Sequence, residues 1–165
     1  MALTATSPPT PTPTPAQTRR EIQRLATAFF RAVSFAPGEP ARYEALAQLF
    51  VVGGRLINNS GEAPAVHALE AFVQSRMASH ADGTITRYEV QELADTTEVF
   101  GGIAHRASSF VRRGDGPGGA FEVRGMILLQ MVRDLDGWRI SAVAWDDQHA
   151  GESLTAHPEP TEFGA

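Results

Sequence analysis

The sequence predicts an α+β fold, in which three N-terminal helices pack on a strongly curved, mostly antiparallel sheet. Apolar residues recur every three or four positions in three segments before Gly83, which is typical of amphipathic helices. After Gly83 this period gives way to β-rich runs separated by turn residues. With 165 residues and 42% hydrophobic content, the chain can build one domain with a real core. Helices followed by strands favour helices that cover one face of a single sheet.

Each predicted helix has an apolar face and a start or stop signal. The first carries Ile22, Leu25, Ala26, Phe29, Phe30 and Val33, and Pro37 and Gly38 end it. Pro40 opens a short second helix with Tyr43, Leu46, Leu49 and Phe50. A short strand follows in residues 54–61. Pro64 then starts a third helix with Val66, Leu69, Phe72, Val73 and Met77 inward, and Asp82 and Gly83 end it.

Four long strands are predicted in residues 84–93, 98–113, 120–133 and 137–147. Two hairpin turns, GDGPGG (114–119) and DLDG (134–137), separate the last three. Residues 1–18, rich in proline and threonine, are expected to form a disordered tail, because they bury almost nothing. Residues 149–165 are expected to form a flexible second tail, which leaves 19–148 as the domain.

Composition excludes several kinds of function. A net charge of −5 and the absence of a basic stripe argue against a nucleic-acid partner. No apolar run approaches the roughly 20 residues that span a bilayer, and no secretory signal is evident, so we expect a cytoplasmic protein without membrane contact. The chain lacks both cysteine and lysine, which excludes thiol catalysis and Schiff-base chemistry. The five histidines show no metal-ligand spacing, and we predict neither a metal nor a cofactor.

Three segments give the chain a family resemblance: FGGIAHRASSFVRR (100–113), GWRISAVAWDD (137–147) and FAPGEPARYEALAQLF (35–50). With the order of the elements, they resemble a bacterial subgroup of the nuclear transport factor 2-like superfamily, which includes ketosteroid isomerases, polyketide cyclases and dehydratases. The resemblance covers about residues 20–148. It implies a cone with a mostly apolar pocket for a small ligand, and a homodimer formed through the outer sheet face.

The DLDG turn predicts which side chains face the pocket. If it pairs Arg133 with Trp138, one apolar face combines Gly125, Ile127, Leu129 and Met131 with Trp138, Ile140, Ala142, Ala144 and Asp146. The preferred register across GDGPGG places Ala104, Arg106, Ser108 and Phe110 inward and His105 and Ser109 outward. A shift of one residue would reverse that assignment. The outer face is then expected to carry Met126, Leu128, Val132, Val143 and Trp145.

Arg106 and Asp146 are the candidate catalytic residues. A buried arginine needs a partner, and Asp146 is expected to share its face. Arg106 then offers a clamp for a carboxylate or enolate oxygen, with Asp146 holding it or acting as a base. The alternative is a structural ion pair that braces the sheet.

The predicted pocket lining comprises Tyr43, Asn58, Tyr88, Ser108, Ile127 and Ala144. Asn58 lies near where ketosteroid isomerases place a catalytic aspartate, and an amide cannot act as a general base.

Three functions remain open at this stage. The first is a cofactor-free isomerase, cyclase or dehydratase that acts on a small, largely apolar substrate. The second is a non-catalytic protein that binds an unidentified small molecule in the same pocket. The third is a dimeric scaffold whose cavity is filled by its own side chains.

Overall fold

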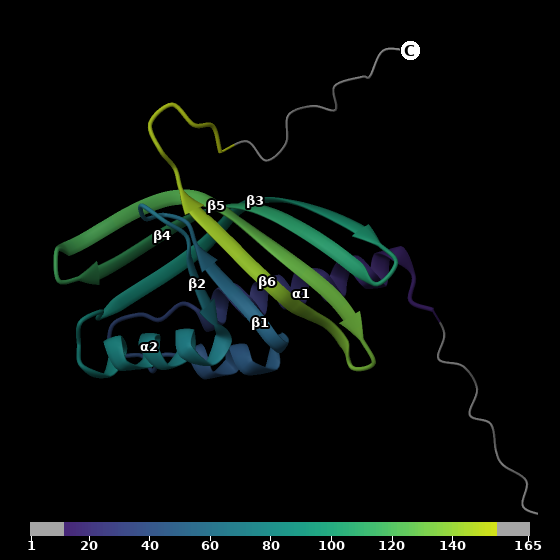
Figure 1. Ribbon diagram of the computed structural model, residues 1–165, viewed down its shortest axis with the longest axis horizontal. Coiled ribbons are helices and arrows are strands. Elements are labelled where there is room, and N and C mark those ends of the chain that lie inside the picture. The colour runs from purple at the N-terminus through teal and green to yellow at the C-terminus, as the bar shows by residue number, and fades with distance from the viewer. Residues whose placement is uncertain (1–11, 155–165) are drawn as a thin grey trace, which may run out of the picture.

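The computed structural model describes residues 12–154 and shows helices on one side of a curved sheet (Figure 1). The helices are α1 (Pro15–Ala32), the 3-10 helix η1 (Tyr43–Gln48) and α2 (Leu69–Ala81). The strands are β1 (Phe50–Asn58), β2 (Ala65–Ala68), β3 (Arg87–Phe100), β4 (Ile103–Gly116), β5 (Gly119–Asp134) and β6 (Gly137–Asp147). This is the predicted α+β cone.

The six strands form one open sheet in the order β2-β1-β6-β5-β4-β3. All neighbouring pairs are antiparallel except β1 and β6, which run parallel. The core lies between the helices and the concave face of the sheet, where Ile22, Leu46, Leu56, Leu129 and Ile140 are at most 1% exposed. Among the described residues, no helix is both long and apolar enough to cross a membrane.

Helix α1 begins inside the segment that the sequence predicts as a tail. Thr14 caps it, because its hydroxyl accepts from the backbone N–H of Gln17 while the Gln17 side chain accepts from the N–H of Thr14. Pro15 fits the first helical position, since the first N–H of a helix has no partner within it. The helix thus takes in residues 15–18 of the predicted tail, whereas residues 1–11 lie outside the described residues.

The predictions for the second and third helices need correction. The second is a 3-10 helix that ends at Gln48, and Phe50 already opens β1. Residues Ala65–Ala68, expected at the start of the third helix, form β2 and pair with β1, so Val66 is 60% exposed instead of inward. Helix α2 therefore begins at Leu69, and its buried residues are Leu69 and Phe72.

A β-bulge in β6 decides which of its side chains face the helices. Arg133 pairs with Trp138 as predicted, and Met131 pairs with Ile140. Gln130 then pairs with Ala142, so Ser141 is the extra residue on β6. Because one extra residue exchanges the two faces of a strand, the inner face continues with Val143 and Trp145.

The prediction that Ala142, Ala144 and Asp146 face inward is therefore wrong. The same shift corrects the predicted outer face, because Val143 is fully buried inside the molecule. The register across the GDGPGG turn is the preferred one: Ala104, Arg106, Ser108 and Phe110 pair with Met131, Leu129, Ile127 and Gly125.

Candidate functional site

A mainly apolar pocket lies between the helices and the inner face of the sheet, with a volume of about 50 Å³. Its walls are mainly apolar side chains from both helical and strand elements: Phe29, Val33, Leu56, Phe72, Val90, Phe110, Ile127 and Trp145. Four further lining residues carry polar groups, namely Tyr43, Arg76, Tyr88 and Arg112. Small ligands are typically held by such apolar walls with a few convergent polar groups.

Tyr43 of η1, Arg76 of α2 and Tyr88 of β3 bring polar groups to one part of this pocket. The Arg76 guanidinium carbon lies 5.2 Å from the centre of the Phe72 ring and 6.0 Å from that of Tyr88. Burial raises the pKa of the Tyr43 hydroxyl well above its usual value, nearby Tyr88 raises it further, and Arg76 opposes the increase. Tyr43 is therefore a neutral hydrogen-bond donor at physiological pH.

Arg112 and Asp147 form an ion pair beside the same pocket. Nη2 of Arg112 lies 2.5 Å from Oδ2 of Asp147, and both side chains are about one-fifth exposed. Two further polar atoms of the pair, Nε of Arg112 and Oδ1 of Asp147, are buried and have no hydrogen-bond partner among the described residues. The bulge in β6 creates this pair, because it turns Asp147 toward the inner face in place of Asp146.

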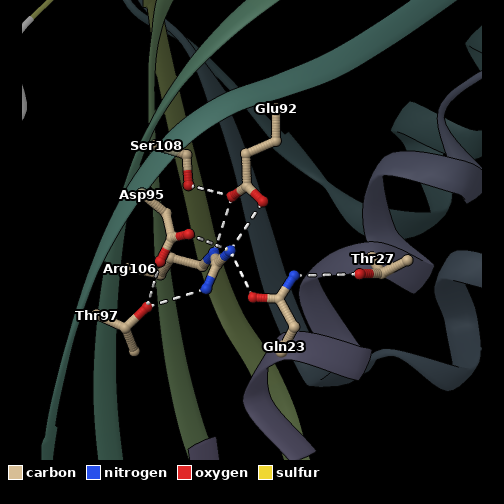
Figure 2. Close-up of polar contacts among 7 residues, drawn as sticks. All are labelled: Gln23, Thr27, Glu92, Asp95, Thr97, Arg106 and Ser108. Carbon is tan, nitrogen blue, oxygen red and sulfur yellow. Dashed lines mark hydrogen bonds and ion pairs between the residues drawn. The ribbon is translucent and has the colours of Figure 1, made fainter. Parts of the chain in front are cut away.

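Arg106 lies in a separate buried cluster (Figure 2). Its Nε and Nη2 each donate to a different oxygen of Glu92 at 2.8 Å, while Nη1 donates to Thr97 at 3.0 Å. Nη2 also contacts Gln23 of α1 at 3.0 Å and Oδ1 of Asp95 at 2.9 Å. With 3% of its side chain exposed and all three nitrogens directed at protein groups, Arg106 is held as a structural cation.

A second bulge brings two further partners, Asp95 and Thr97, to Arg106. Glu92 pairs with Phe110 and Ala94 with Ser109, so Leu93 is the extra residue on β3. The face exchange that follows puts Asp95 and Thr97 on the inner side, where the unbulged strand would place Ala94 and Thr96. Two carboxylates thus meet one guanidinium.

Asp146 does not face the pocket or contact Arg106, although the sequence predicts both. Its Oδ2 accepts from Nδ2 of Asn59 at 2.7 Å, and its Oδ1 lies 3.5 Å from Nε2 of the exposed His149. The prediction that Asp146 pairs with Arg106 is wrong, because the Ser141 bulge turns Asp146 to the opposite face. His105 lies outward, where its Nδ1 is 2.8 Å from Nε2 of Gln130.

The predicted lining residues divide into two groups. Tyr43, Tyr88 and Ile127 line the pocket. The other three do not: Ser108 is fully buried and donates to Glu92, Asn58 accepts from the Ser60 N–H in a turn, and Ala144 lies outward after the bulge.

Sequence reasoning missed Arg76, Arg112, Trp145 and Asp147. Only Arg76 had a local signal, since it follows Phe72 by four residues and so lies on the same helix face. In the described part of the chain, no group of three or more His, Asp or Glu side chains is arranged to hold a metal ion.

Comparison with known proteins gives structural matches only. No family model matches the sequence, and no curated protein matches it. A nuclear transport factor 2-like superfamily protein from Salmonella enterica superposes with a TM-score of 0.67 at 15% identity, over 84% of this chain and 98% of that one. A Caulobacter vibrioides protein with a cystatin-like fold gives 0.63 at 17% identity, over 81% and 91%.

A third structure comes from Streptomyces avermitilis and is named as a candidate dehydratase of the same family. It gives a TM-score of 0.65 at 16% identity, over 83% of this chain and 100% of that one. Likeness at this level of identity concerns the fold. Together with the curved sheet, the helices on its concave side and the pocket between them, it shows that this chain has the cystatin-like cone fold of the nuclear transport factor 2-like superfamily.

Proposed function

We propose that this protein binds a small, largely apolar molecule in the pocket between α1, η1, α2 and the sheet. The observation that carries the proposal is the convergence of Tyr43, Arg76 and Tyr88 on a pocket whose other walls are mainly apolar. None of these three side chains makes a side-chain hydrogen bond within residues 12–154, so their polar groups remain available to a bound molecule, whereas a pocket that served only as core has no need of such groups. The candidate scaffold function is less well supported for this reason.

The pocket volume limits the size of the ligand. About 50 Å³ is well below the roughly 150 Å³ of an apolar cavity that accepts benzene. The half-buried lining residues mark the open side of the pocket, and they are Arg76, Tyr88, Val90, Arg112 and Trp145. A ligand of a few heavy atoms fits within the walls, and a longer one extends past these half-buried side chains.

Acid–base catalysis without a cofactor is the second candidate function, and Asp147 favours it. Its Oδ1 is buried and has no hydrogen-bond partner within residues 12–154, and Arg112, which holds its other oxygen, lines the pocket. Asp147 itself does not line the pocket, so it is a candidate general base for isomerisation, cyclisation or dehydration only for a substrate that displaces Arg112 from it. Arg106 has no nitrogen left for a substrate, and Asp146 lies on the other face, so neither is assigned a chemical role.

The binding proposal is tested with butanamide, a neutral probe of suitable size. Methyl resonances of Val90 and Ile127 should shift on titration of the wild-type protein, because both side chains line the pocket. Val90→Phe should abolish the shifts by filling the space, whereas Leu93→Phe, on the same strand but 44% exposed and outside the pocket, should preserve them. Shifts that survive Val90→Phe, or a wild-type protein without shifts, would contradict the proposal.

A further inference from the structure

The charges that line the pocket are unbalanced. Both charged lining residues, Arg76 and Arg112, are cationic, and no carboxylate of residues 12–154 lines the pocket. Asp147 neutralises Arg112 through an ion pair. Arg76 forms no ion pair within residues 12–154, so one positive charge remains at the pocket without an anionic partner.

Arg76 is placed so that its hydrogen-bond donors stay available. Its guanidinium carbon lies near the faces of Phe72 and Tyr88, and this contact stabilises the cation without using its N–H groups. No side-chain hydrogen bond from Arg76 occurs in the described part of the chain, although the side chain is half-buried. A planar guanidinium with an unused edge matches the two oxygens of a carboxylate.

The two tyrosines add neutral donors beside this cation. Neither the Tyr43 nor the Tyr88 hydroxyl makes a side-chain hydrogen bond among residues 12–154. The two hydroxyls interact electrostatically, because Tyr88 raises the pKa of Tyr43. The positive charge of Arg76 lowers the same pKa. One cation and two O–H donors, none of which is negatively charged, favour the binding of an anionic ligand group over a neutral or cationic one.

We infer that the ligand is a small carboxylic acid in its ionised form, with its carboxylate bound by Arg76 at the opening and its apolar part inside. This inference rests on the proposed function. Leu56, Phe29 and Ile127, each at most 5% exposed, form the apolar end of the site. Arg76 thus determines specificity for charge, and the walls determine specificity for size.

The test compares butanoate with butanamide, which has the same shape and no charge. We expect butanoate to bind the wild-type protein at least ten-fold more tightly, measured from the same methyl shifts. Arg76→Met keeps the length of the apolar stem and removes the charge, so it should reduce this ratio to near one. Arg20→Met, which removes an exposed arginine of α1, is the matched control and should leave the ratio unchanged.

Failure of this inference is distinguishable from failure of the proposed function. If both probes bind the wild-type protein equally, or if Arg76→Met keeps the preference for butanoate, the carboxylate assignment is wrong while the pocket still binds ligands. If neither probe binds at up to tens of millimolar, both the pocket proposal and the carboxylate assignment are overturned. Arg76→Lys serves as a folding check and should keep part of the preference through its retained charge.

Discussion

Arg106 and Glu92 form a bidentate pair, in which Nε and Nη2 of the arginine each lie 2.8 Å from a different carboxylate oxygen. The pair joins β4 to β3 at positions that are not directly opposite, since Arg106 is in register with Thr97. Gln23 connects the same guanidinium to α1. The sheet and the first helix are thus connected by polar contacts as well as by the apolar core.

Removal of this cation should be strongly destabilising. Arg106→Gln leaves the Glu92 carboxylate, whose side chain is only 17% exposed, without its cation, and the free energy of unfolding should fall by about 3 kcal/mol. His105→Gln, on the neighbouring residue of the same strand, should change it by less than about 1 kcal/mol, because His105 faces outward. Urea unfolding of both variants checks this, and a larger loss for the histidine variant would contradict the register.

Gly125 should tolerate no side chain. A Cβ at this position would lie 2.2 Å from the backbone oxygen of Asp146 and 2.7 Å from Cζ of Phe110. Gly125→Ala should therefore lower the free energy of unfolding by about 1–3 kcal/mol through overpacking. Gly118→Ala is the matched control, because a Cβ at that position would have nothing within 4 Å. Equal melting temperatures for the two variants would refute the close packing at Gly125.

Stability at alkaline pH should depend on Tyr43. Its pKa in the folded protein is raised, mainly by burial, whereas in the unfolded chain it ionises near pH 10. Above that pH the unfolded state releases a proton that the folded state retains, so stability falls as pH rises; below it, Tyr43 has no effect on the pH dependence. Because the chain has two tyrosines and no lysine, this dependence is simple to isolate.

Denaturant unfolding from pH 8 to 11.5 provides the measurement. The wild-type protein should lose stability above about pH 10, whereas Tyr43→Phe should show a flatter profile there. A Tyr43→Phe profile that parallels the wild type would show that Tyr43 ionises freely in the folded protein.

We expect a homodimer formed through the outer face of the sheet. On this face Leu128 is 40% exposed, between the half-buried Met126 and Val132. Association of two such faces around a two-fold axis would bury these side chains. Sedimentation equilibrium at micromolar concentration should give a dimer mass that Leu128→Glu reduces to a monomer mass. A monomeric wild-type protein would exclude this interface.

The sequence could predict most elements and the preferred registers across both hairpin turns, because local signals encode them. The DLDG turn specifies the Arg133–Trp138 pair, and alternation then places Met131 and Ile140 inward. Nothing in the sequence marks Ser141 or Leu93 as an extra residue, so every face assigned beyond them was wrong or missing. Pro64 resembles a helix start, but the open edge of β1 pairs with residues 65–68 and overrides that local signal.

The Ser141 bulge also has a consequence for comparison across distant relatives. At 15% to 17% identity, sequence letters alone do not distinguish Asp146 from Asp147, which are identical neighbours at the end of β6. The inner position is the one paired with Gly125, whatever its number along the strand. Residue roles in this fold are therefore best transferred from one protein to another by the partner residue on the neighbouring strand. A single insertion or deletion near Ser141 would exchange the faces of the end of β6 and give a descendant different inward groups, with a change of only one residue in composition.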